Sequence, residues 1–230
     1  MRGEPTSPAV ACRCRFLYTT AMTRPLLAPG SADALLFDLG QVVFDIDFSK
    51  ALACWAGHAG CEAVQLKDRF SRDEIYKGHE TGKVSDAEFF AALRASLGIG
   101  ISDAQFLEGW NAIFAGEMPG IAALLTRAAQ RLPLYVFSNT NSAHVEHFSV
   151  LHADVLGHFR ELFLSSSIGL RKPDAEAFDH VVQAIGVPAS RIVFFDDSAE
   201  NVVGARARGL AAVHVTSPGD VAETLAALGI

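Results

Sequence analysis

Short apolar runs that alternate with helical patterns constrain the fold of this 230-residue chain most strongly. An uninterrupted apolar run of about four to eight residues suits a strand buried on both faces, as in parallel sheets covered by helices. Half of the residues are apolar, which is enough for a sizeable core. We therefore predict an α/β fold with a five-stranded, Rossmann-like parallel sheet. The predicted strands are ALLFD (34–38), LPLYVFS (132–138), LFLSS (162–166), RIVFFDD (191–197) and LAAVHV (210–215).

Three of the predicted strands end in polar residues. These residues are Asp38, Ser138 with Asn139, and Asp196 with Asp197. Ligands bind beyond the carboxyl ends of the strands in an open α/β sheet, so we expect these side chains to converge. Each one alone would also suit a helix cap or a turn. Two adjacent carboxylates at one strand end repel each other without a cation, which favours a metal site there.

The long segment between the first two predicted strands indicates an inserted domain. It spans roughly a hundred residues, far more than a single crossover helix needs. Its patterns are helical, because Ser85 with Glu88 and Ser102 with Gln105 fit capping boxes ahead of apolar periodicity. We predict a catalytic core and a helical cap. The core comprises residues 31–48 and 119–230, and the cap comprises residues 49–118.

Residues 1–30 are rich in Pro and Arg and show neither a strand nor a helix period. We expect them to form a disordered extension. Arg13 and Arg15 interrupt any secretory apolar region and so disfavour a signal peptide, whereas an Arg-rich organelle-targeting segment fits better. A true start at Met22, with an over-long gene prediction before it, is the stronger alternative.

Composition excludes several classes of partner. Of the net charge of −7, residues 1–30 carry +3, which leaves −10 for the remainder. An acidic surface repels nucleic acid backbones, so we expect no nucleic acid partner. No apolar run approaches the roughly 20 residues of a membrane span. The cysteines lack the paired spacing of zinc sites. Because they are few, a cytoplasmic location, where thiols stay reduced, is favoured. The cysteines of the cap are expected to pack in its core. The cysteines of the whole chain are Cys12, Cys14, Cys54 and Cys61.

Four motifs follow the order used by the haloacid dehalogenase (HAD) superfamily: Asp38, Ser138-Asn139, Lys172-Pro173 and Asp196-Asp197. Over residues 34–215 the chain resembles that superfamily. Within it the chain looks most like bacterial α-D-glucose-1-phosphate phosphatases with a helical cap. The resemblance implies a Mg²⁺-dependent phosphomonoester hydrolase that forms an aspartyl-phosphate. The segments that carry it are FDLGQVVFDIDF, WNAIF, FSNTN, LRKP and VFFDDSAEN.

The resemblance assigns roles to the residues of these motifs. Asp38 would be the nucleophile, and a carboxylate is competent toward phosphorus. The magnesium ligands would be Asp38, the main-chain carbonyl of Gly40 and Asp197, with Asp196 acting through a water. A phosphate dianion repels an attacking carboxylate, so positive charge from Mg²⁺ and Lys172 must be present before attack.

The remaining predicted site residues would bind the substrate. The Ser138 hydroxyl and the Asn139 backbone N–H would hold the phosphoryl group for in-line attack. Residues of the cap should choose the organic part of the substrate, because the core motifs contact only phosphate. Tyr76 and Trp110 are the cap candidates, and His144, close to Ser138 in sequence, is a further candidate for the pocket.

Gly40 departs from the usual pattern of the superfamily. Most of its phosphatases have a second aspartate there, which acts as a general acid and contributes about 10²- to 10⁴-fold. Three explanations stay open. The leaving group could be good, as in a sugar 1-phosphate; Asp45 or Asp47 could supply the carboxyl group; or the enzyme could be slow or inactive. The FDLG resemblance favours the first two.

We therefore predict hydrolysis of a small-molecule phosphate ester, with a sugar phosphate as substrate and a sugar 1-phosphate favoured. A 2-haloacid dehalogenase is an alternative, since halide departure needs no general acid. That reaction also needs no magnesium ion, so the presence of both Asp196 and Asp197 favours a phosphate ester as substrate. A non-catalytic metabolite- or partner-binding module on a decayed phosphatase fold is a further alternative, and the intact Asp38 and Lys172 argue against it. A monomer or weak homodimer is expected.

Overall fold

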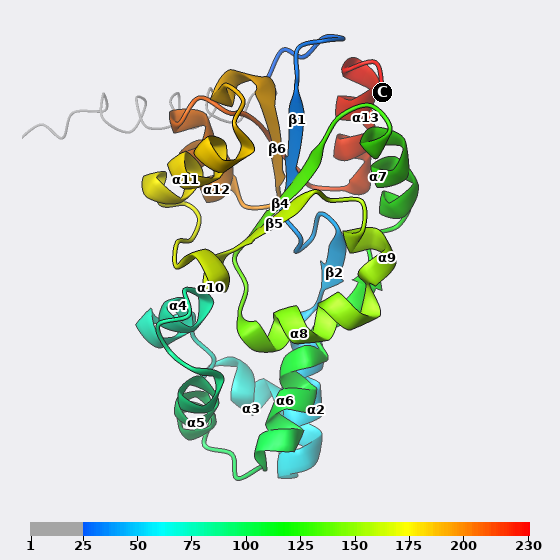
Figure 1. Cartoon of the computed structure of the whole chain (residues 1–230). Coiled ribbons are helices and arrows are strands. Elements are labelled where there is room, and N and C mark those ends of the chain that lie inside the picture. Colours follow the sequence, from blue (N-terminus) through cyan, green and yellow to red (C-terminus); the bar gives the residue numbers. More distant parts are fainter. Residues whose placement is uncertain (1–24) are drawn as a thin grey trace, which may run out of the picture.

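The computed structural model describes residues 25–230, and the predictions for residues 1–24 lie outside this range. A five-stranded parallel sheet with strand order β5-β4-β1-β6-β7 forms its centre (Figure 1). The predicted α/β fold is therefore confirmed. The strands are β1 (Ala34–Phe37), β4 (Leu134–Ser138), β5 (Glu161–Leu164), β6 (Ile192–Asp196) and β7 (Ala211–His214).

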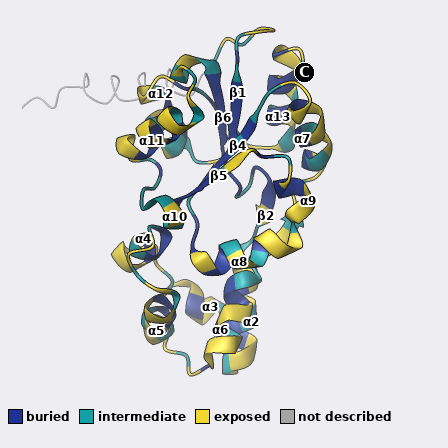
Figure 2. Cartoon of the chain, in the orientation of Figure 1, coloured by how far each residue is buried: buried dark blue, intermediate teal, exposed yellow. Residues whose placement is uncertain are grey.

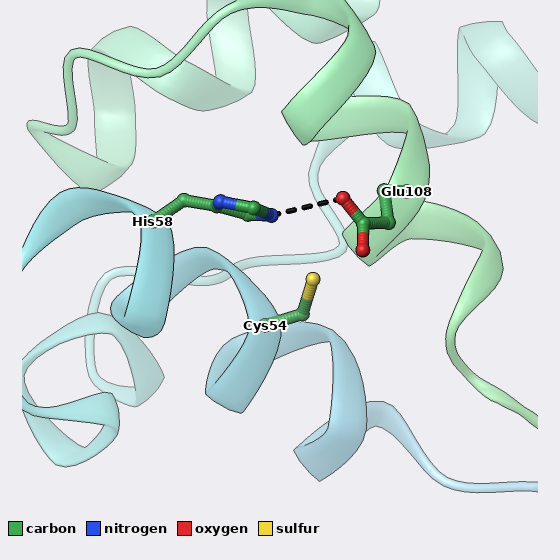
Figure 3. A group of neighbouring side chains, drawn as sticks. All are labelled: Cys54, His58 and Glu108. Atoms are coloured by element: carbon green, nitrogen blue, oxygen red, sulfur yellow. Dashed lines mark hydrogen bonds and ion pairs between the residues drawn. The ribbon is translucent and has the colours of Figure 1, made fainter.

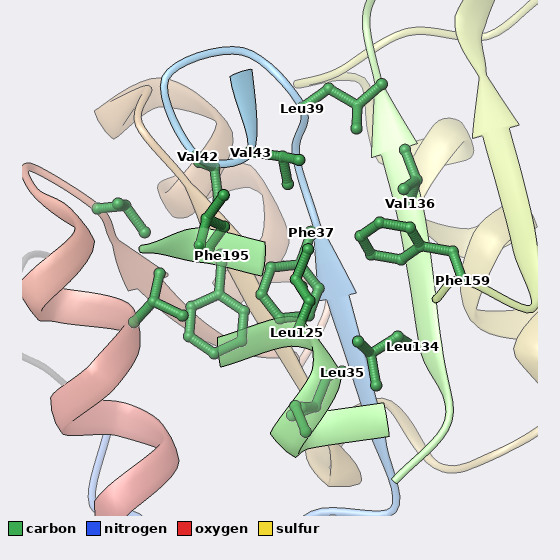
Figure 4. Packing of buried hydrophobic residues seen from close by; sticks show 14 of the residues in the cluster. Leu35, Phe37, Leu39, Val42, Val43, Leu125, Leu134, Val136, Phe159 and Phe195 are labelled. Carbon is green, nitrogen blue, oxygen red and sulfur yellow. The ribbon is translucent and has the colours of Figure 1, made fainter. Parts of the chain in front are cut away.

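Both faces of the sheet are buried, because side chains alternate between the two faces along each strand. In β1, Leu35 and Phe37 belong to one hydrophobic cluster, and Ala34 and Leu36 belong to the other. Figure 4 shows the first cluster, where Phe37 stacks on Phe195 with ring centroids 4.6 Å apart. Helices α7 (Ile121–Ala129) and α13 (Pro218–Ala227) cover this face, and α11 (Ala175–Ile185) and α12 (Ala199–Ala207) cover the other (Figure 1).

Helices between β1 and β4 pack around a hydrophobic cluster of their own. Trp55 and Trp110 are its largest members, and both are fully buried with ring centroids 6.2 Å apart. The capping boxes expected at Ser85 and Ser102 are both present. Figure 2 shows that these helices keep an exposed outer side. The helices are α2 (Phe48–Ala59), α3 (Ala63–Lys67), α4 (Glu74–Glu80), α5 (Asp86–Leu97) and α6 (Asp103–Asn111).

A two-stranded antiparallel ribbon at the base of these helices was not predicted. Strand β2 (Phe44–Ile46) pairs with β3 (Phe114–Glu117), and Phe44 lies opposite Glu117. The WNAIF run, which we interpreted as cap sequence, therefore enters a strand at Phe114. Strands this short are difficult to recognise from alternation, and their pairing joins segments that are far apart in the sequence.

The end of the third predicted strand also needs correction. Strand β5 ends at Leu164, and Ser165 begins the short helix α10 (Ser165–Ile168). The buried Ser165 hydroxyl explains the change, because it accepts from the Thr140 amide and donates to the Glu80 carbonyl, 2.6 Å away. Within residues 25–230, no helix is long and apolar enough to cross a membrane. The other helices are α8 (Ser142–Leu151), α9 (Ala153–Leu156) and the 3-10 helix η1 (Ala189–Arg191).

Candidate active site

The carboxyl ends of β1, β4 and β6 face a cavity of about 730 Å³. Residues of the β2–β3 ribbon, α4 and α8 complete its walls. The polar strand ends do converge there, as the strand order requires, because β1 lies between β4 and β6. The predicted site residues that line the cavity are Asp38, Gly40, Tyr76, Ser138, Asn139, His144, Lys172 and Asp197.

Lys172 is the buried centre of the site, with 1 % of its surface exposed. Its Nζ lies 2.7 Å from Asp196 Oδ2 and 3.0 Å from Asp38 Oδ1. The Asn139 side chain holds the backbone of this lysine, since its Oδ1 accepts from the Lys172 amide and its Nδ2 donates to the Lys172 carbonyl. Asn139 therefore positions Lys172 through its side chain, a role that we did not predict.

The charges of the site are unbalanced, because three carboxylates surround one ammonium group. Burial raises the pKa of Asp38 to about 7, against the opposing attraction of Lys172. Burial also raises the pKa of Asp197, and the neighbouring Asp196 carboxylate adds to this effect. Burial alone would lower the pKa of Lys172, but the attraction of Asp196 and Asp38 raises it overall. A further cation would relieve this crowding.

The three carboxylates fit a magnesium ion. Oxygen atoms of Asp38, Asp196 and Asp197 all lie within 4.8 Å of one another. Asp196 is fully buried, and its two oxygens already accept from Lys172, the Ser198 amide and Asn201. Asp197 is exposed to the cavity. Carboxylates that keep room for water suit Mg²⁺, and Asp38 with Asp197 are the better placed for direct contact.

Ser138 lines the cavity from the end of β4, and Tyr76 lines it from helix α4. Ser138 is the last residue of β4 and is 4 % exposed. Tyr76 on α4 lines the cavity, and burial raises the pKa of its phenol. The phenol therefore stays protonated and can serve as a hydrogen-bond donor.

Trp110 does not line the cavity, in contrast to the prediction that it binds substrate. Its side chain is fully buried. The indole Nε1 donates to Asn141 Oδ1, and the ring stacks on His144 with centroids 4.7 Å apart. Its contacts therefore support His144, which does line the cavity.

His144 is held as a neutral imidazole. Its Nε2 donates to the Trp110 carbonyl 3.0 Å away, and its Nδ1 accepts from Asn141 Nδ2 at 3.0 Å. Burial lowers its pKa to about 3. At neutral pH this ring therefore carries no charge, and it contributes shape and hydrogen bonding to the cavity wall.

The sequence analysis did not predict the pair formed by Arg171 and Glu80. The Arg171 Nε and Nη2 donate to Glu80 Oε2 at 3.0 and 2.8 Å, and both residues line the cavity. Arg171 stands next to Lys172 in the LRKP motif, and this is the signal that could have indicated it. No sequence pattern pairs it with Glu80, because the two residues are 91 positions apart.

Neither proposed substitute for the missing general acid lines the cavity in this structure. Asp47 caps α2, where its Oδ1 accepts from the Ser49 amide at 2.9 Å. Asp45 is exposed on β2. These positions favour the explanation in which the leaving group needs little help from an acid.

Known proteins resemble this chain over most of its length. Residues 32–209 match the profile of the haloacid dehalogenase-like hydrolases. The chain is 26% identical over 186 residues to a sesquiterpene phosphatase of Aspergillus oryzae, covering 80% of this chain and 89% of that protein. It is 26% identical over 173 residues to a D-ribitol-5-phosphate phosphatase of Bacteroides thetaiotaomicron, covering 73% and 84%. A HAD family enzyme of Bacteroides thetaiotaomicron, solved as a magnesium complex, superposes with a TM-score of 0.72 at 25% identity, covering 81% and 94%.

Proposed function

Because this chain belongs to the haloacid dehalogenase-like hydrolase family, we propose that it is a Mg²⁺-dependent phosphatase that acts on a small phosphorylated metabolite. One observation carries the proposal: Asp38, Lys172, Asp196 and Asp197 meet at the cavity beyond the carboxyl ends of the strands. Relatives named as phosphatases support it. The few cysteines favour the cytoplasm as its location, and a monomer or weak homodimer is proposed.

The carboxylate of Asp38 is oriented for nucleophilic attack. Its Oδ1 accepts from the Leu39 amide at 2.7 Å and lies 3.0 Å from Lys172 Nζ, so the group cannot turn freely. Attack would form an Asp38 O–P bond and break the ester P–O bond, and water would then hydrolyse the aspartyl-phosphate to restore Asp38. Lys172 and the Ser138 hydroxyl would hold the phosphoryl oxygens in line.

Asp38, Asp197 and the Gly40 carbonyl would hold Mg²⁺, with Asp196 in a supporting position. The ion would supply positive charge beside the phosphoryl oxygens, which Lys172 alone does not balance.

A sugar phosphate is the proposed substrate, and a sugar 1-phosphate is favoured. The leaving oxygen lacks the usual general acid, because Gly40 has no carboxyl group and neither Asp45 nor Asp47 lines the cavity. An anomeric oxygen leaves more readily than a simple alkoxide, so this limitation costs least for a 1-phosphate. Hydroxyl groups of a sugar could bond to the polar cavity wall, which includes Gln41 and Asn141. The relative that acts on ribitol 5-phosphate is consistent with a polyol substrate.

Phosphate release from a panel of esters tests the proposal. The panel contains a hexose 1-phosphate, a hexose 6-phosphate, a pentitol 5-phosphate and an aryl phosphate, each with Mg²⁺ and with a chelator. We expect metal-dependent turnover that is highest on the 1-phosphate. Asp38→Asn should abolish release, whereas the matched surface variant Asp154→Asn should not. Silence across the panel, or full activity of Asp38→Asn, would contradict the proposal, and a halide-release assay would then test dehalogenation.

A further inference from the structure

A second group of metal-ligand side chains lies on the surface of the cap. Cys54 and His58 stand one turn apart on α2, and Glu108 faces them from α6 (Figure 3). The His58 Nε2 lies 2.9 Å from Glu108 Oε2, and one ligand atom from each residue lies within 4.8 Å of the other two. None of the three residues lines the active-site cavity.

The two helices that carry these residues are held firmly together. Trp55, next to Cys54 in the chain, stacks on Phe106 with ring centroids 4.6 Å apart, and its Nε1 donates to the Phe106 carbonyl at 2.8 Å. Gly109, next to Glu108, leaves the space that the Trp55 indole fills, because a Cβ at this position would overlap the indole. The spacing of the three ligand side chains therefore rests on a packed interface, as a preorganised site requires.

The donor set suits a borderline transition metal. A thiolate, an imidazole and a carboxylate are all ligands of zinc, which prefers four-coordinate tetrahedral geometry. Two donors of a tetrahedral zinc ion lie roughly 3.3–3.8 Å apart, given metal–ligand distances of about 2.0–2.3 Å. Small side-chain rotations would bring separations between 2.9 and 4.8 Å into that range. His58 and Glu108 are exposed and Cys54 is half-buried, so an ion and a fourth ligand from water can reach them.

We propose that Cys54, His58 and Glu108 form a zinc site that links α2 to α6 on the outer face of the cap. The ion would bind three protein ligands and one water. The Cys54 thiol would give up its proton to the solvent as the sulfur binds. The site is separate from the magnesium carboxylates, and its role is to stabilise the cap rather than to take part in hydrolysis.

Cobalt(II) titration of the full-length, metal-free protein tests the site. Excess Mg²⁺ is present throughout, so that the active-site carboxylates are occupied. We expect one equivalent of Co²⁺ to produce a thiolate-to-cobalt charge-transfer band, which Zn²⁺ then displaces. Cobalt bound to carboxylates alone gives no such band, so binding at the active site cannot imitate this result. Zn²⁺ should also raise the melting temperature of the wild-type protein.

Variants identify the ligands. The charge-transfer band should be absent in Cys54→Ser, and His58→Asn and Glu108→Gln should each weaken binding by at least about tenfold. The band should persist in the matched variants Cys61→Ser and Cys12→Ser/Cys14→Ser, which test the other thiols. Glu108→Gln changes an exposed side chain, so it also covers the case in which Cys54→Ser fails to fold.

Four outcomes would overturn the proposal. The first is no charge-transfer band in the wild-type protein, and the second is a band that survives Cys54→Ser. The third is a band that is lost in Cys54→Ser while His58→Asn and Glu108→Gln bind Co²⁺ as tightly as the wild-type protein. That result would mean that the Cys54 thiol binds the metal without the other two side chains. A zinc-dependent rise in melting temperature that Glu108→Gln retains in full would likewise contradict the link between α2 and α6.

Discussion

The stability of this protein should depend on pH through one buried imidazole. His144 is 5 % exposed, and burial lowers its pKa to about 3 from an ordinary value of 6.5. The hydrogen bond to the Trp110 carbonyl and the charge of Asp86 act to raise this pKa, whereas His79 and His147 lower it further. The folded protein therefore holds His144 neutral at pH values where the unfolded chain protonates it.

The sign and size of the effect follow from proton linkage. Between about pH 3 and pH 6.5 the unfolded chain binds more protons than the folded protein, so the free energy of unfolding must fall as the pH falls through this window. For His144 alone, these two pKa values give a loss of about 2 kcal/mol at pH 5 and almost none at pH 8. This loss is large beside the roughly 5–15 kcal/mol that stabilises a typical domain.

Urea unfolding at pH 8 and at pH 5 measures the effect, with His144→Phe as the comparison. The variant keeps a neutral ring beside Trp110 and removes the group that titrates. Other titrating groups are present in both proteins, so their contributions cancel in the comparison. We expect the wild-type protein to lose about 2 kcal/mol more than His144→Phe between the two pH values. Equal losses in the two proteins, within about 0.5 kcal/mol, would refute the reasoning.

Three substitutions test other parts of the structure. A Gly40→Asp side chain has room, because a Cβ at this position would lie 3.7 Å from its nearest neighbour. Steady-state kinetics should show faster turnover on esters with poor leaving groups, by up to about 10²-fold, but not on sugar 1-phosphates. Equal effects on both classes of substrate would contradict the leaving-group argument. Lys172→Met should lower kcat by at least about 10²-fold, because Asp196 and Asp38 lose their counter-charge; unchanged kcat would argue against its role. Gly109→Ala should lower the free energy of unfolding by about 1–3 kcal/mol through overlap with the cap indole; denaturant unfolding with unchanged stability would disprove that packing.

Much of the fold follows from local sequence, because the signals that specify it are local. Apolar runs marked the five strands of the sheet, and the capping boxes at Ser85 and Ser102 formed as expected. Gly186 ends α11 with a positive φ of 78°, a backbone conformation that glycine adopts readily at a helix C-terminus. The sequence analysis also predicted that Asp38 and Ser138 converge, because parallel strands end at a common edge of the sheet, and the strand order brings them together.

Only the tertiary structure decided which distant residues meet. Arg171 contacts Glu80 across 91 positions, and His58 contacts Glu108 across 50. Trp110 looked like a substrate contact in the sequence, yet packing turned it into the buried support of His144. Sequence patterns record the burial and local geometry of each element, but contacts between elements depend on how the elements pack against one another. The motifs therefore identified the carboxylates of the candidate active site, whereas the other residues of the cavity wall and the contact of His58 with Glu108 depend on packing.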